Sequence, residues 1–184
     1  MACVFSPRAA LARADVEVGV DDRPAYASLG VVEVGGSGAF AFTSKSTHVS
    51  ARTFVGWFFA NHLQVSGIAE LAWSQVRVPG PADGMVNRSS TLFGIYAEPS
   101  LHVPVSSGSF ALLGLGFGPT YDSEQYGLAV RPRVGFDLQL GGTAIFRPAF
   151  EITYSTVDVV SRSNQSVEGA NLMYGISIGV SAWL

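Results

Sequence analysis

A histidine close to serine is the one arrangement in this sequence that suggests nucleophilic catalysis. His48 stands two residues from both Ser46 and Ser50, and a serine that a histidine deprotonates can act as a nucleophile. Serine is frequent along the chain, so this spacing is a weak signal of an active site. We therefore predict no catalytic residue, and an enzyme is the last of the functions we consider.

The sequence offers no set of residues with the spacing of a metal or cofactor site. The single cysteine, Cys3, excludes a disulfide framework and a cysteine-ligated metal. His62 and His102 are not clustered with carboxylates at ligand spacing, and we expect both to be solvated polar positions. We predict no metal and no cofactor.

Two glycine-rich runs have the composition of phosphate-binding loops. They are Gly35-Gly36-Ser37-Gly38 and Gly114-x-Gly116-x-Gly118. A phosphate loop leads into a helix, but no helical pattern follows either run. Glycines that alternate along a strand instead make room for bulky neighbours or let a sheet curve.

The overall composition excludes several classes of protein. The chain has 184 residues, of which 48% are hydrophobic and 14% are charged. A disordered chain would be less apolar, and a nucleic-acid-binding protein would not carry a net charge of −3. The longest apolar stretches, such as 54–60, fall well short of the roughly 20 residues of a membrane-spanning helix.

A period of two residues runs along most of the chain and predicts strands. In the last block, Tyr174, Ile176 and Ile178 alternate with Gly175 and Ser177. Eight blocks follow this pattern, at 28–42, 48–59, 63–76, 91–104, 109–121, 128–140, 144–154 and 170–184. Short connections at 60–62, 105–108 and 141–143 alternate with longer ones at 43–47, 77–90, 122–125 and 157–168. We predict an all-β, eight-stranded antiparallel up-and-down transmembrane β-barrel.

The charged residues favour a lumen closed by ion pairs. They lie in the polar row of the strands, and the predicted lumen network consists of Glu33, Arg52, Glu70, Glu98, Arg131, Arg133, Asp137, Arg147 and Glu151. Pairing across the short turns brings Arg52 opposite Glu70, Arg147 opposite Asp137, and Arg133 opposite Glu151. An eight-stranded barrel is just wide enough for its side chains to fill it. We expect Phe54, Phe58 and Tyr96 to point inward and the lumen to be plugged.

Aromatic residues near strand ends match the two girdles of a membrane barrel. On the side of the long loops they are Phe42, Trp73, Phe93, Tyr121 and Tyr154, and on the side of the short turns Trp57, Phe59 and Phe146. The polar row is rich in Gly, Ser, Ala and Thr, whereas a solvated outer face would be rich in Lys and Glu. These features favour lipid on the apolar face. A soluble, lipocalin-like carrier with the apolar row inside remains an alternative.

Over about residues 28–184, the chain resembles the OmpA/OmpX-like superfamily, the small eight-stranded outer-membrane barrels of Gram-negative bacteria. The resemblance rests on the strand and loop pattern, the Arg/Glu polar row and a final strand that ends at the C-terminus. It implies an outer-membrane location, contact with lipid and lipopolysaccharide, and recognition of the last strand by the barrel-assembly machinery. The family usually closes with an aromatic residue, whereas here Trp183 precedes a final Leu184.

The first residues are consistent with an export signal. Residues 1–14 end in Ala12-Arg13-Ala14, which resembles a signal-peptidase site. We expect 1–14 to be a remnant of an export signal, 15–27 a periplasmic segment and 28–184 the barrel.

We expect a monomer without nucleic-acid partners that serves a structural or surface-interaction role. Within this role, a partner would bind the long loops, which carry no motif that identifies it. A low-conductance channel is the first alternative function. The resemblance does not decide between the two functions, because proteins of one fold differ in function.

Overall fold

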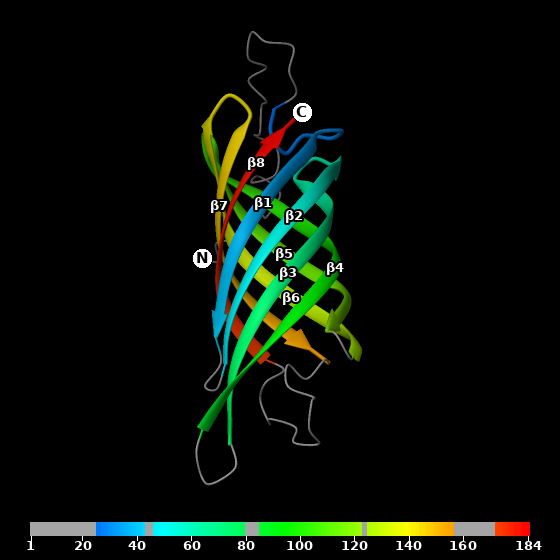
Figure 1. The fold of residues 1–184 in the computed structure, drawn as a ribbon. Helices are drawn as coiled ribbons and strands as arrows, with labels where there is room; N and C mark the ends of the chain where they lie inside the picture. The colour runs from blue at the N-terminus through cyan, green and yellow to red at the C-terminus, as the bar shows by residue number, and fades with distance from the viewer. Residues whose placement is uncertain (1–24, 43–45, 80–84, 123–124, 157–171) are drawn as a thin grey trace, which may run out of the picture.

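The computed structural model describes residues 25–42, 46–79, 85–122, 125–156 and 172–184. These residues form one closed barrel in which each strand pairs antiparallel with the next and β8 pairs with β1 (Figure 1). The strands are β1 (Val32–Phe42), β2 (Ser46–Ala60), β3 (Leu63–Pro79), β4 (Met85–Ser106), β5 (Ser109–Asp122), β6 (Gln125–Gly141), β7 (Ala144–Ser155) and β8 (Leu172–Trp183). The predicted fold class is confirmed.

Tight turns join the strands at one end of the barrel, which we call the turn end. His62, Gly108 and Gly142 adopt positive φ values of 67°, 76° and 54° there. Turns that match the twist of the flanking strands require such left-handed conformations. These turns set the register of the strands that they join. In β2 and β3, that register places Arg52 opposite Glu70.

The expected loop at 77–90 is wrong in its extent. β3 continues to Pro79 and β4 begins at Met85, and the two strands pair over this stretch, with Arg77 opposite Asn87. The polar residues of the stretch suggested a loop, but backbone pairing does not require apolar side chains. The resulting hairpin projects beyond the other strands at the opposite end, which we call the loop end (Figure 1). The predicted loop at 157–168 lies outside the described residues.

A short segment before β1, Ala25–Val31, folds against the turn end. Phe58 donates a backbone hydrogen bond to Val31 (2.9 Å), and His62 donates one to Ala27 (2.7 Å). Strand β1 therefore begins at Val32 rather than at residue 28. Residues 1–24, which include the expected export-signal remnant and most of the expected periplasmic segment, lie outside the described part of the chain.

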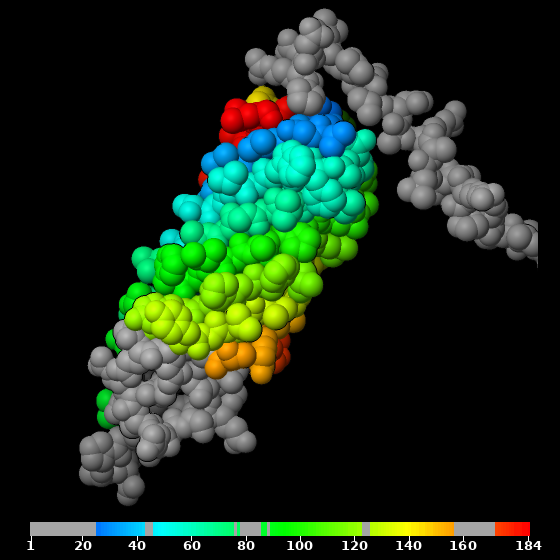
Figure 2. All heavy atoms as spheres, turned by 90° about the vertical axis from the view of Figure 1, so that its right-hand side faces the viewer, coloured from blue at the N-terminus to red at the C-terminus, as the bar shows by residue number. Residues whose placement is uncertain are grey.

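The strands alternate between an apolar outer face and a polar lumen. In β8, Ile176, Ile178 and Val180 are 57–60% exposed, whereas Ser177 is 2% exposed. Successive strands lie side by side across the outer surface, from β1 in blue to β6 in yellow-green (Figure 2). Within the described residues, no helix meets the length and hydropathy of a membrane-spanning helix.

Candidate functional site in the lumen

The charged side chains of the barrel are gathered in its lumen. Of the nine residues predicted to line it, eight are at most 8% exposed and Arg133 is half-buried. Among charged residues whose side chains the structure describes, Arg77 alone is exposed, and it lies near the loop-end tip of β3. Asp122, which we expected in a loop, ends β5 and is also buried.

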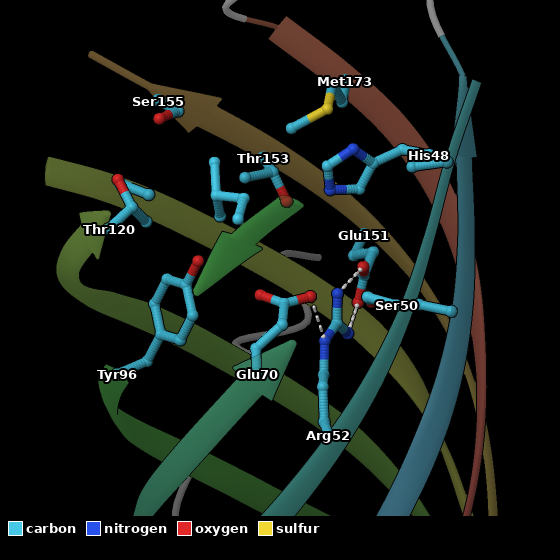
Figure 3. A pocket seen from close by; sticks show the side chains of 14 residues that line it. His48, Ser50, Arg52, Glu70, Tyr96, Thr120, Glu151, Thr153, Ser155 and Met173 are labelled. Atoms are coloured by element: carbon cyan, nitrogen blue, oxygen red, sulfur yellow. Dashed lines mark hydrogen bonds and ion pairs between the residues drawn. The ribbon is translucent and has the colours of Figure 1, made fainter. Parts of the chain in front are cut away.

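Four of these residues form what we call the loop-side cluster: Arg52, Glu70, Arg131 and Glu151. Arg52 donates from Nε to Glu70 Oε1 (2.7 Å) and from Nη1 and Nη2 to the two carboxylate oxygens of Glu151 (2.6 and 2.5 Å). Arg131 donates to the second oxygen of Glu70 (2.8 Å). Arg52 therefore holds two carboxylates together across the lumen (Figure 3). The cluster holds two cations and two anions, so buried charge is compensated.

Five residues form the turn-side cluster: Tyr26, Glu33, His102, Asp137 and Arg147, each at most 3% exposed. Arg147 binds Asp137 through Nε and Glu33 Oε1 through Nη2 (2.9 Å). His102 Nδ1 lies 2.6 Å from Asp137 Oδ2. Tyr26 donates its hydroxyl hydrogen to Asp137 Oδ2 (3.0 Å) and accepts a hydrogen bond from Arg147 Nη2 (3.0 Å). This network spans the lumen near the turn end.

The remaining charged pair differs from the prediction. Arg133 and Glu151 are register partners on β6 and β7, as expected, but their side chains do not pair. Arg133 instead donates to Glu98 Oε1 on β4 (2.5 Å). Gly114 on the intervening β5 permits this contact, because a Cβ there would lie 3.1 Å from Glu98 Oε1 and 3.2 Å from Arg133 Cγ. The other two expected pairs, Arg52–Glu70 and Arg147–Asp137, are present.

Sequence reasoning missed part of the turn-side cluster. We expected His102 to be solvated, but it is fully buried and also contacts Ser100 (3.0 Å from Nε2 to Oγ). Its position near a strand end suggested solvent, whereas the segment Ala25–Val31 covers that end. Tyr26 was assigned to a periplasmic segment. A lone aromatic residue before the first strand carries no periodic signal that would have placed it in the lumen.

Apolar side chains complete the closure of the lumen. Tyr26, Val31, Phe58, Ile145 and Trp183 pack together at the turn end. Phe54 and Tyr96, which we also expected to point inward, are 8% and 2% exposed. Arg131 lies over the Tyr96 ring at 4.1 Å from its centroid, which is a cation–π contact.

A small pocket lies on the loop side of the loop-side cluster. Its central free space is about 20 Å³, which is room for one or two water molecules. Figure 3 shows His48, Thr120 and Thr153 around it, with Arg52, Glu70 and Glu151 at its floor.

The His48 side chain does not form an accessible catalytic pair. Its Nδ1 lies 2.5 Å from Ser74 Oγ on the neighbouring strand, a serine that the sequence spacing did not single out. Ser74 is fully buried and does not line the pocket. A nucleophile must meet its substrate, so this arrangement does not support catalysis. Among the described residues, no group of His, Cys, Asp or Glu is arranged to hold a metal ion.

The predicted girdle residues lie on the outer surface. Phe42, Trp57, Phe59, Trp73, Phe93, Tyr121 and Tyr154 are 38–52% exposed, and Phe146 is half-buried. The register places Phe93 opposite Tyr121 on β5, so these two rings share one level of the barrel. Contact with a membrane interface stays a prediction.

Solved structures support the fold. Neisserial surface protein A matches with a TM-score of 0.56 and 16% identity, covering 83% of this chain and 95% of that one. The outer membrane protein OprG from Pseudomonas aeruginosa matches with a TM-score of 0.56 and 16% identity, covering 85% of this chain and 97% of that one. The N-terminal barrel domain of Pseudomonas aeruginosa OprF matches with a TM-score of 0.53 and 10% identity, covering 85% of this chain and 98% of that one. No protein-family model and no curated protein matches the chain.

These likenesses extend over almost the whole length of each solved barrel. At these identities they establish the fold. The chain has the fold of the small eight-stranded outer-membrane β-barrels, and the expected resemblance to that superfamily is confirmed at this level.

Proposed function

We propose that this chain is an integral β-barrel protein of the bacterial outer membrane with a structural or surface-interaction role. The observation that carries the proposal is its inverted polarity. The outer face is apolar, and the charged side chains described in the barrel, apart from Arg77 near a tip, lie inside. Such a surface is stable in lipid and would aggregate in water.

The closed lumen supports a role at the membrane surface more than a transport role. Three groups of ion pairs and the packed turn end fill the interior. The loops and the projecting β3–β4 hairpin then remain to contact a partner. We propose that outer-membrane lipid and lipopolysaccharide surround the barrel, that the assembly machinery reads its last strand, and that the protein acts as a monomer without enzymatic activity.

A low-conductance channel is the second candidate, and the pocket beside the loop-side cluster favours it. Conduction would require Arg52 to release Glu70 or Glu151, because these side chains form the floor of the pocket. Single-channel recording of the purified protein in planar bilayers tests this candidate. If the recordings show no discrete current steps, the channel is ruled out and the surface role stands as the proposed function. The soluble-carrier alternative needs an apolar interior, which the ion-paired lumen does not provide.

Folding in the presence and absence of a membrane mimetic tests the proposed function. The full chain is diluted from urea with and without detergent micelles, and each sample is run unboiled and boiled on a denaturing gel. We expect a heat-shifted band only with micelles, because folded barrels resist the gel detergent until they are boiled. A compact soluble β-protein in detergent-free buffer would overturn the proposal.

A substitution on the outer face sharpens this test. Ile178→Arg places a charge on a side chain that is 57% exposed in the middle of β8. We expect it to reduce folding into bilayers by about 2–4 kcal/mol, the cost of arginine near the midplane. The control is Tyr126→Arg, at an 84% exposed position at the start of β6 near the loop end. Equal tolerance of both changes would count against a lipid-facing surface.

A further inference from the structure

Tyr26 precedes the first strand, yet its side chain contacts side chains from seven of the eight strands. Its hydroxyl lies 3.0 Å from Asp137 Oδ2 and from Arg147 Nη2, 3.3 Å from His102 Nδ1 and 3.4 Å from Glu33 Oε2. Its ring packs against the His102 ring, at a centroid distance of 6.0 Å, and against three aromatic rings. Their centroid distances are 5.5 Å to Phe58, 5.2 Å to Phe110 and 6.3 Å to Trp183. These partners belong to β1, β2, β4, β5, β6, β7 and β8.

This binding site exists only in the closed barrel. Glu33 on β1 and Trp183 on β8 are register partners across the seam that closes the barrel. In a sheet that has not yet closed, β1 and β8 are its two opposite edges, so these two partners are far apart. Asp137 on β6 and Arg147 on β7 bind Tyr26 from the β8 side of that seam. The site therefore assembles when β8 pairs with β1.

The backbone of the same segment is attached to β2, and the residue that follows the segment pairs across the seam. Gly30 donates a hydrogen bond to the Phe58 carbonyl (2.8 Å). Directly after the segment, Val32 donates to the Leu184 carbonyl (3.2 Å) and Leu184 donates to the Val32 carbonyl (2.8 Å). Because Val32 follows the segment directly, fixing residues 25–31 also fixes the residue of β1 that pairs with Leu184.

We propose that the turn end of the closed lumen is an intramolecular binding site for Tyr26, and that docking of Ala25–Val31 is the last step of folding. The docked segment locks the β1–β8 seam and seals the lumen at the turn end. The role of the segment in sealing a membrane barrel rests on the proposed function, whereas the order of the folding steps does not depend on it.

This order of folding steps predicts which rate, folding or unfolding, changes when the Tyr26 contacts are lost. Contacts that form after the folding transition state change the unfolding rate and leave the folding rate almost unaltered. Tyr26 contacts form after closure, so their loss must appear in unfolding. If the segment instead docked early and nucleated the barrel, its loss would slow folding.

The test compares three variants of the full chain in detergent micelles. Tyr26→Phe keeps the ring and removes the hydroxyl that bonds Asp137 and Arg147, whereas Tyr26→Ala also removes the ring. The matched control is Leu29→Ala, in the same segment, because Leu29 is 63% exposed. Folding and unfolding rates are followed by the heat-shifted gel band at a series of urea concentrations.

We expect Tyr26→Phe to unfold about 10-fold faster, because it loses hydrogen bonds to charged groups. Tyr26→Ala should unfold about 100-fold faster, since it also leaves a cavity. Folding rates of all variants should stay within about twofold of the wild type, and Leu29→Ala should match the wild type in both directions.

Two results would overturn the proposal: Tyr26 variants that fold more slowly in proportion to their lost stability, or Tyr26 variants that unfold at the wild-type rate. A wild-type chain that folds without micelles overturns the proposed function instead. In that case the same rates, measured in detergent-free buffer by fluorescence, decide the order of docking.

Discussion

The two ion clusters of the lumen differ in what surrounds them. The turn-side cluster, which includes Tyr26, is sealed by Phe58 and Trp183, and its five members are at most 3% exposed. The loop-side cluster borders a pocket, and Arg52 is 8% exposed there. A charge that loses its partner beside a pocket can recruit water, whereas one in a sealed site cannot. Equivalent ion pairs should therefore contribute unequally to stability.

Reversing the charge of Arg147 should have the largest effect. Arg147→Glu places a third carboxylate beside Glu33 and Asp137, which are both fully buried. Loss of one partner of a buried pair alone costs about 3–5 kcal/mol, so we expect the variant to fail to give a heat-shifted band. Adding Asp137→Arg should recover part of the loss. Equal effects of the single and the double reversal would contradict the pairing.

Neutral substitutions compare the two clusters directly. Arg147→Met leaves Glu33 and Asp137 without their cation, and we expect a loss of about 5 kcal/mol in urea unfolding in micelles. Arg52→Met leaves Glu70 paired with Arg131 and frees only Glu151 beside the pocket, so about 3 kcal/mol is expected. If Arg52→Met cost as much as Arg147→Met, the pocket would make no difference to the cluster beside it.

The space left by the missing side chain at Gly114 predicts a smaller loss of stability when that space is filled beside the Arg133–Glu98 pair. Gly114→Ala brings a methyl group to about 3 Å from Glu98 and Arg133, and overpacking of this kind costs about 1–3 kcal/mol. Gly67→Ala is the matched control, because a Cβ there meets nothing within 4 Å. Unfolding midpoints in urea distinguish the two. A neutral Gly114→Ala would show that Arg133 does not need the gap.

The smallest effect is expected beside the pocket, at the Ser74–His48 contact. Ser74→Ala removes the hydrogen bond to His48 and should cost about 1 kcal/mol. The control is Thr120→Val, because the buried Thr120 hydroxyl has no hydrogen-bond partner among the described residues. That change should leave the free energy of unfolding unaltered or slightly raised. A loss for Thr120→Val equal to that for Ser74→Ala would place a bound group on Thr120.

The sequence was informative where contacts are local. Strand alternation predicted the eight strands, and short turns fixed the register that pairs Arg52 with Glu70 and Arg147 with Asp137. Contacts across the lumen depend instead on closure of the barrel. Arg52 therefore reaches Glu151, and Arg133 crosses a glycine to reach Glu98, although neither contact follows from a turn register.

The N-terminal segment shows the same limit. Tyr26 occupies a site made by residues that are up to 157 positions away in the chain, such as Trp183. Its surroundings arise only from the folded barrel, and no alternation or spacing near residue 26 encodes them. The expectation that His102 is solvated was wrong for the same reason, because Tyr26 from the segment before β1 packs against it.

The three tryptophans allow the most direct test of the central claim, that the apolar face contacts lipid and the polar face lines a closed lumen. Trp57 and Trp73 are 49% and 44% exposed on the outer face, whereas Trp183 is 7% exposed inside. Variants that keep one tryptophan and carry phenylalanine at the other two positions are folded into vesicles with lipids brominated near the headgroup. The account predicts strong fluorescence quenching of Trp57 and Trp73 and little of Trp183. Quenching of Trp183 with protection of Trp57 and Trp73 would contradict it.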